Sequence, residues 1–243
     1  MAKNYGFQNE WDFFNYLNGK KVGEINSSFK AMLASIYENL TDDMTIKCYV
    51  DMAKNKEDMW ITINSVRKNI SIKMGSENTF HTEYIYNFTD FLERQNVPMK
   101  IINDILDYHF LKENNLSVSV NANNIIEKIT LNIYKQKYHK KINNINLYFQ
   151  NNESLLKKLI NRFVIGKNDL IIHGTVENFS YITKEEIIKV LLANKIMDSS
   201  SVHFSHLYFQ AKSRKDEVMR FFFQIKWYKL EEDISIMRQK KEH

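Results

Sequence analysis

Glycine and proline are scarce in this chain. Its 243 residues include six glycines and one proline. These two residue types supply many of the backbone conformations that tight turns and irregular loops require. Their scarcity favours long, uninterrupted helices and strands over a loop-dominated fold. Hydrophobic residues make up 44% of the sequence and charged residues 26%, which is typical of a globular protein and excludes a disordered or collagen-like chain.

The single cysteine, Cys48, restricts the chemistry that the chain can support. One thiol forms neither an intramolecular disulfide nor a thiolate zinc cluster, so a reducing cytoplasm is the expected compartment. Polar residues interrupt the N-terminal segment where a signal peptide would lie. No apolar run approaches the roughly 20 residues that a membrane-spanning helix needs. We therefore expect a cytoplasmic protein without a membrane partner.

The formal net charge is +5, which is basic enough to suggest an anionic partner but too small for a charge-driven binding tail. The sequence contains no Walker loop, no glycine-rich dinucleotide motif and no Gly-x-Ser-x-Gly nucleophile elbow. Nucleotide hydrolases, Rossmann enzymes and α/β-hydrolases therefore lack their usual sequence support.

The pattern of apolar residues predicts a mixed α/β chain. Helical spacing predicts helices over residues 10–17, 24–40, 79–94, 98–110 and 184–194, the last opened by a Thr183–Glu186 capping box. Runs rich in β-branched and aromatic residues predict strands at residues 45–50, 58–64, 69–74, 170–174, 178–182, 202–211 and 218–228. The polar middle, residues 111–165, indicates two or three further helices. Residues 238–241 are expected to form a frayed end.

Two of these strands, residues 58–64 and 69–74, predict an antiparallel hairpin because only a short polar turn separates them. Pairing Ile63 with Lys68 buries one apolar face. The same register places Asp58 directly opposite Lys73. The other face of the hairpin should therefore end in a carboxylate and an amine side by side.

An acid that opens one strand and a Ser-x-Lys triplet that ends the next resemble the PD-(D/E)XK nuclease superfamily. The matching residues are Asp58 and Ser71-Ile72-Lys73, within a resemblance that covers about residues 24–95. Ser71 stands where the superfamily usually has an acid. This variant resembles the CCGG-cleaving restriction enzymes, in which an acid on the following helix replaces the missing carboxylate. Glu83 would take that place, and Glu24 would supply the acid of the opening helix.

The resemblance implies a restriction-endonuclease-like fold, with a mixed β-sheet flanked by helices. The whole chain, residues 1–243, would form one domain. Its catalytic core would span about residues 20–110, and extra helices and a C-terminal β-hairpin would follow over residues 111–243.

The resemblance also implies a Mg²⁺-dependent site. Asp58 and Glu83 would hold the metal together with the carbonyl of Ile72, and several of its waters would stay in place. Lys73 would orient the attacking water and offset negative charge on the transferring phosphoryl group. Ser71 would contribute an orienting hydroxyl.

Each of these residues also has a plainer interpretation. Asp58 and Lys73 would form a cross-strand ion pair on a solvated face. Glu83 and Glu24 would be charges that a helix dipole favours in the first turn, and His81 would be a structural histidine. A second x-Lys pattern, residues 224–226 with Lys226, is an alternative site without an obvious acid on a neighbouring strand.

The turn at residues 212–217 predicts a second point of contact with DNA, because it presents a cluster of basic residues between two strands. The expected DNA-binding residues are His81, Gln210, Lys212, Arg214 and Lys215. The resulting hypothesis is a DNA endonuclease of a type II restriction or host-defence system. It would act as a homodimer on double-stranded DNA, with a companion methyltransferase in the same system. The alternative is a nuclease-fold protein without activity that binds nucleic acid or another protein.

Overall fold

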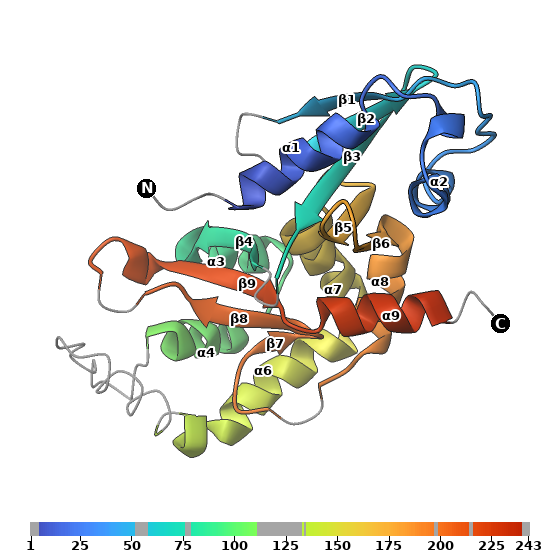
Figure 1. Ribbon diagram of the computed structural model, residues 1–243. Coiled ribbons are helices and arrows are strands. Elements are labelled where there is room, and N and C mark those ends of the chain that lie inside the picture. Colours follow the sequence, from blue (N-terminus) through green and yellow to red (C-terminus); the bar gives the residue numbers. More distant parts are fainter. Residues whose placement is uncertain are drawn as a thin grey trace. The chain divides into compact units, whose positions relative to one another are not determined.

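The computed structural model describes residues 5–51, 58–75, 79–110, 133, 135–196, 199–213 and 216–239 (Figure 1). The chain forms two compact units, each built from separate segments. Unit 1 comprises Met1–Asn78, Ile165–Val190 and Lys229–His243, and unit 2 comprises Thr79–Val164 and Leu191–Tyr228. The predicted catalytic core, about residues 20–110, contributes to both units.

Unit 1 is organised around a mixed five-stranded sheet with the order β1-β2-β3-β5-β6. Only β3 and β5 pair in parallel, and the other neighbouring pairs are antiparallel. The strands are β1 (Lys47–Val50), β2 (Met59–Ile63), β3 (Val66–Lys73), β5 (Leu170–Gly174) and β6 (Phe179–Thr183). The helical segments are α1 (Tyr5–Leu17), the 3₁₀ turn η1 (Val22–Glu24), α2 (Ser27–Ala34), most of α8 (Lys184–Ala193) and α9 (Leu230–Gln239).

The core of unit 1 lies between this sheet and the first two helices. Phe13 and Leu17 of α1 and Phe29 of α2 are fully buried, and so are Met59 and Ile61 of β2. Buried and half-buried residues alternate along β2, because successive side chains of a strand point to opposite faces of the sheet. One face of the β1–β2–β3 sheet therefore packs on the helices, and the other face carries the polar residues.

The β2–β3 hairpin forms as predicted, but in a different register. The structure pairs Met59 with Ile70 and Ile63 with Val66, two residues away from the predicted pairing of Ile63 with Lys68. The reason is a tighter turn, because Asn64 and Ser65 both adopt positive φ angles of 46° and 65°. This is the backbone of a two-residue type I′ turn. A shift of two residues keeps every side chain on its predicted face.

Unit 2 contains an antiparallel four-stranded sheet with the order β4-β9-β8-β7. The strands are β4 (Thr79–Tyr84), β7 (His203–Phe204), β8 (Leu207–Ala211) and β9 (Phe222–Trp227). The helices are α3 (Ile85–Arg94), α4 (Met99–Phe110), α6 (His139–Asn151) and α7 (Glu153–Ile160), with a π-helical turn, η2 (Asn161–Ile165), and a 3₁₀ turn, η3 (Met219–Phe221). Aromatic rings fill the interior, where Phe88, Phe163, Phe204, Phe209 and Phe223 are in mutual contact.

Two predicted helices are wrong in extent. The first part of the predicted helix 79–94 is strand β4, which pairs with β9, and only α3 is helical. The helical spacing of Phe80, Tyr84 and Phe88 was misleading, because the partner strand supplies backbone hydrogen bonds to a segment rich in threonine and aromatic residues. The predicted helix 24–40 begins instead after the N-cap Asn26, whose side chain accepts a hydrogen bond from the Phe29 N–H, and it ends at Ala34.

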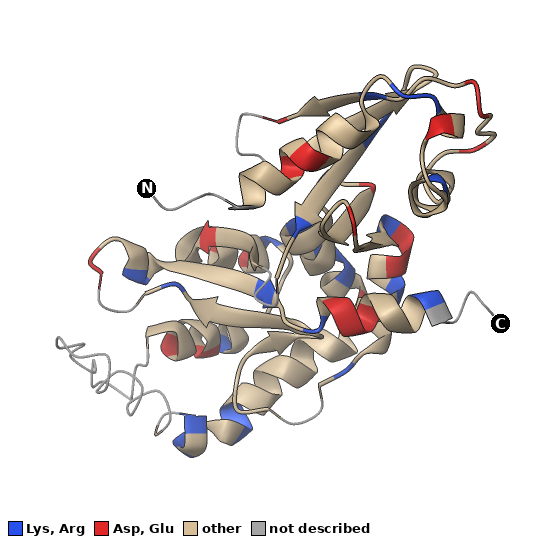
Figure 2. Ribbon diagram, viewed as in Figure 1, with Lys and Arg blue, Asp and Glu red and all other residues tan. Residues whose placement is uncertain are grey.

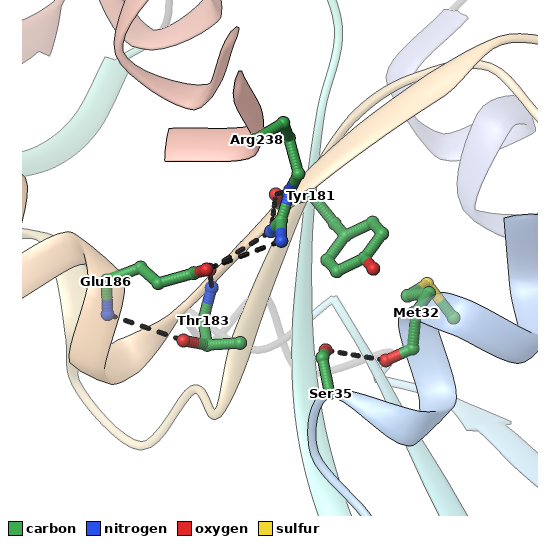
Figure 3. Close-up of polar contacts among 6 residues, drawn as sticks. All are labelled: Met32, Ser35, Tyr181, Thr183, Glu186 and Arg238. Carbon is green, nitrogen blue, oxygen red and sulfur yellow. Dashed lines mark hydrogen bonds and ion pairs between the residues drawn. The ribbon is translucent and has the colours of Figure 1, made fainter. Parts of the chain in front are cut away.

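The start of α8 confirms its predicted capping box (Figure 3). The Thr183 N–H donates to Glu186 Oε2 at 2.8 Å, and the Glu186 N–H donates to Thr183 Oγ1 at 3.3 Å. Arg238 of α9 also donates to this carboxylate and to the carbonyl of Tyr181. The expected frayed end is therefore wrong for Arg238, which holds α9 against β6 and α8. The end of that segment, residues 240–241, lies outside the described residues.

Within the ranges given above, no helix is long and apolar enough to cross a membrane.

Candidate active site

Asp58 forms the centre of a polar cluster at the end of the β2–β3 hairpin. Its Oδ2 atom accepts hydrogen bonds from Ser71 Oγ at 2.9 Å, from the backbone N–H of Ile72 at 2.6 Å and from Lys73 Nζ at 3.3 Å. The observed register explains the arrangement, since the Asp58 N–H donates to the carbonyl of Ile70 and so lies level with the start of the Ser71–Lys73 segment. The carboxylate and the amine that the sequence predicted to meet are therefore in contact.

The cluster is sheltered without being sealed from solvent. The side chains of Asp58 and Lys73 are 17% and 22% exposed, while Ser71 is buried. All three hydrogen bonds end on Oδ2, and Oδ1 accepts none from the part of the chain that the structure describes. A carboxylate held in this way has a fixed orientation, and its second oxygen is left without a hydrogen bond from those residues. Asp58 and Lys73 therefore form a largely buried ion pair and not a fully solvated one.

Glu10 of α1 is a second carboxylate whose charge interacts with this cluster, and the sequence reasoning missed it. Partial burial is the main cause that raises the pKa of Glu10 to about 7, and the negative charge of Asp58 adds to the effect. Lys73 acts in the opposite direction. Glu10 lies three residues before the buried Phe13 and seven before Leu17, so it continues the apolar stripe of its helix. An acid in line with a buried stripe was the signal that could have identified it.

Two hydrogen bonds with residues of β5 hold both sides of the site. The buried Asn9 side chain donates to the carbonyl of Gly174 at 2.9 Å, which fixes the α1 turn that carries Glu10. On β5, His173 lies beside Lys73 in the parallel register. Its Nε2 atom lies 2.9 Å from the carbonyl of Gly75, to which it must donate, and so it fixes the chain just after Lys73.

The oxygen ligands of this cluster suit a Mg²⁺ ion, which keeps several waters, better than a metal whose ligands all come from the protein. Among the described residues, no group of three or more His, Cys, Asp or Glu side chains could hold a metal ion. Mg²⁺ commonly binds one or two carboxylates, keeps several waters and takes further oxygens from a substrate phosphate. Asp58 and Glu10 match that requirement. The Ile72 N–H bonds to Asp58, and its carbonyl points to the same side of the strand.

Glu83, the predicted second ligand, lies in unit 2 on strand β4 and not on a helix. Its side chain is 10% exposed and forms an ion pair with Arg162 and a 2.8 Å contact with His81 Nε2. Burial opposes ionisation, but the hydrogen bonds from His81 and Arg162 outweigh it and lower the pKa of Glu83. Its role as a metal ligand stays a prediction, and the structure gives both of its oxygens protein partners.

Glu24 and His81 have local partners. Glu24 is the last residue of the turn η1, where its Oε2 accepts a hydrogen bond from the Lys21 N–H at 2.8 Å. It therefore lies in a 3₁₀ turn and not in the predicted helix 24–40, and its role as the acid of an opening helix stays a prediction. The ring of His81 packs 5.1 Å from that of Phe163 and contacts Glu83.

The predicted DNA-binding residues near the end of the chain are only partly described. Gln210 on β8 accepts a hydrogen bond from Gln224 on β9 at 3.2 Å, and the exposed Lys212 follows β8 directly. Arg214 and Lys215 lie outside the described residues. The alternative lysine, Lys226, is buried on β9, where its register partners are Thr79 and Tyr208.

Some basic residues of the polar middle pair with acids of the same unit. In Figure 2 the start of α6 carries basic residues in blue and α4 carries acidic residues in red. Lys141 at the start of α6 contacts Asp104 and Asp107 of α4 at 2.9 Å and 2.8 Å. Burial alone would lower the pKa of Lys141, but its hydrogen bonds to these two acids raise it. Lys158 donates to Gln95 at 2.6 Å. These two lysines connect helices of unit 2.

Comparison with known proteins supports the fold. The sequence matches no protein-family model and no curated protein. Among solved structures, the chain is similar to the restriction endonuclease MspI in complex with its cognate DNA, with a TM-score of 0.52 and 11% sequence identity. The similarity covers 93% of this chain and 93% of that chain. The predicted restriction-endonuclease-like mixed α/β fold is therefore confirmed.

Proposed function

We propose that this chain, which has the fold of a restriction endonuclease, is a Mg²⁺-dependent endonuclease that hydrolyses phosphodiester bonds in DNA. The observation that carries the proposal is the Asp58 carboxylate, which Ser71, Ile72 and Lys73 hold in place. The charge of Glu10 interacts with it. Hydrolysis of a phosphodiester requires charge stabilisation on the phosphoryl group and a positioned water. The cluster contains groups suited to both tasks.

Each residue has a distinct role in this proposal. Asp58 and Glu10 would hold Mg²⁺, which supplies Lewis-acid polarisation of the phosphoryl oxygens. The hydroxyl of Ser71 fixes the orientation of Asp58. Lys73 would orient the attacking water and offset negative charge as the phosphoryl group is transferred. Glu10 takes the place that the sequence assigned to Glu83, because its charge interacts with those of Asp58 and Lys73.

The proposal includes a biological setting. Cleavage of both strands of a two-fold symmetric DNA site favours a homodimer. An enzyme of a restriction system would require a companion methyltransferase that protects the host DNA. A second candidate is a nucleic-acid-binding or protein-interaction factor of the same fold without activity, and Ser71 favours it by standing where the superfamily usually has an acid.

The test is cleavage of unmethylated plasmid DNA in the presence of Mg²⁺ or Mn²⁺. We expect discrete fragments from the wild type and a loss of at least about a hundredfold in rate for Lys73→Ala, since a group that stabilises transition-state charge typically contributes that much. Glu10→Gln should also lose activity, with partial recovery at high Mg²⁺ because one ligand remains.

Lys68→Ala is the matched control. Lys68 is also on β3, is 27% exposed and pairs with Asp169 at 3.4 Å. Its removal therefore breaks a similar ion pair that does not involve Asp58. Equal cleavage by the wild type and Lys73→Ala would contradict the assignment and direct attention to Lys226. The absence of both cleavage and metal binding in the folded wild type would favour the inactive candidate.

A further inference from the structure

The polar face of the β1–β2–β3 sheet carries a column of stacked side chains. Tyr49 of β1 and Trp60 of β2 stack with their ring centroids 5.5 Å apart and their planes at 20°. The guanidinium carbon of Arg67 on β3 lies 4.1 Å from the centroid of the Trp60 ring. The column Tyr49–Trp60–Arg67 thus crosses three neighbouring strands, and its central ring has a partner on each side.

The column lies on the same face of the sheet as the candidate active site. Trp60 follows Asp58 by two residues, so its side chain points to the same face about 7 Å further along the strand. The register pairs Tyr49 with Trp60, and Trp60 with Asn69. Cys48, Met59 and Ile61 alternate with the column and are buried on the opposite face.

The two ends of the column remain accessible. Tyr49 is 48% exposed, and Arg67 is an exposed residue. The Nε–H of Arg67 donates to Asn69 Oδ1 at 3.0 Å, whereas its Nη groups have no hydrogen-bond partner in the described part of the chain. A guanidinium has five N–H donors in a planar fork that suits phosphate oxygens. Lys47, which precedes Tyr49 by two residues on the same face, is also exposed.

An exposed aromatic ring beside cationic side chains is the combination that single-stranded nucleic acids recognise. Bases stack on aromatic rings while Arg and Lys contact the backbone phosphates. Such stacking requires a base whose face is open, and in a duplex the neighbouring base pairs cover both faces. The column therefore fits an unpaired nucleotide better than a base pair.

We propose that the column Tyr49–Trp60–Arg67 binds unpaired nucleotides next to the scissile phosphate. Tyr49 stacks on a base, and Arg67 binds a backbone phosphate. The proposal rests on the proposed function, since it is the cluster at Asp58 that fixes where the strand is cut. It adds to the proposed function that the DNA opens to a single-stranded segment at the cleavage site.

The test measures binding without added metal, so that no cleavage is needed. A fluorescein-labelled single-stranded 12-mer and the duplex of the same sequence serve as probes in anisotropy titrations. We expect Tyr49→Ala and Arg67→Gln each to weaken binding of the single strand by about tenfold, which is within the usual range for loss of one base–aromatic contact. Arg67→Gln should also lower the slope of log K against log salt by about 0.7, because one phosphate contact is lost.

Two control variants match these changes. Tyr86→Ala removes a tyrosine of unit 2 that is 40% exposed, and Lys30→Gln removes a positive charge of α2 that pairs with Asp42. Both should bind the single strand as the wild type does.

Three outcomes would contradict one of the two proposals. If the wild type cuts plasmid DNA and both Tyr49→Ala and Arg67→Gln bind the two probes normally, this inference is wrong and the proposed function is intact. This inference is also wrong if the wild type binds the duplex more tightly than the single strand and the two variants lose equal affinity for both probes. If the wild type cuts no DNA but binds the single strand, and Tyr49→Ala weakens that binding, the proposed function is wrong and the binding inference is not.

Discussion

At the scale of single residues, His203 on β7 is an ionisable side chain placed where its charged form is unfavourable. Its Nδ1 atom is buried and has no hydrogen-bond partner within the described ranges. Burial is the main cause that lowers the pKa of His203 to about 4, and the positive charges of His206 and Lys135 add to it. His203 therefore stays neutral in the folded protein over a pH range in which an unfolded chain would protonate it.

This shift predicts a loss of stability in mild acid. Below about pH 6.5 the unfolded state binds a proton at residue 203 that the folded state does not accept until about pH 4. The free energy of unfolding should therefore fall by up to about 3 kcal/mol as the pH drops from 6.5 to 4. His203→Phe keeps a ring and removes the titration, so its thermal midpoint should depend less on pH in this window. Parallel curves for the two proteins would contradict the prediction.

The site residues show what sequence reasoning can and cannot reach. Asp58, Ser71 and Lys73 were identified because a short hairpin determines which side chains share a face, and those three residues are in contact. Glu10 escaped because its proximity to Asp58 depends on how α1 packs on the sheet, which no local pattern encodes. Glu83 was assigned to a helix because the pairing of β4 with β9 joins residues about 140 positions apart.

At the scale of elements, the turn between β2 and β3 sets the geometry of the candidate site. Asn64 and Ser65 both occupy the left-handed region, which asparagine tolerates but in which serine is strained. That turn determines the register and therefore places Asp58 level with Ser71. A longer turn, as the sequence predicted, would have placed Asp58 opposite Lys73 instead.

We predict that Ser65→Gly stabilises the protein by about 0.5–1 kcal/mol, because Asn-Gly is the preferred sequence for a type I′ turn. The measurement is urea unfolding, in which the midpoint should rise with an unchanged slope. Ser65→Val is the matched opposite change, since a β-branched residue fits a positive φ poorly, and it should lower the midpoint. A higher midpoint for both variants would show that the turn conformation is not the cause.

At the scale of the whole molecule, the chain passes between the two units four times, after residues 78, 164, 190 and 228. Unit 1 therefore depends on α9 at the end of the sequence, whose Leu230, Ile234 and Met237 are buried. Helix α9 packs against β6 and is held there by Arg238, as described above. Sequence reasoning found most of these elements, but their grouping into two units depends on strand pairings that join distant segments.

Truncation after Tyr228 tests this organisation. The shortened chain contains every segment of unit 2 but lacks the third segment of unit 1. We expect β5 and β6 to lose protection against amide hydrogen exchange by at least about tenfold, while β8 and β9 keep theirs. DNA cleavage should fall as well, because β5 supports Lys73 through the parallel pairing. Uniform loss of protection in both units would contradict the prediction.

The parallel pairing of β3 with β5 also has a consequence for how the protein is made. The two strands lie side by side, yet Asn69 and Asp169, which bond at their start, are 100 positions apart in the chain. During synthesis at about 5–20 residues per second, the β1–β2–β3 hairpins leave the ribosome several seconds before β5 exists. For that time β3 exposes an unpaired edge, which is a template for aggregation. The candidate active site likewise gains the support of His173 only once most of the protein has been translated.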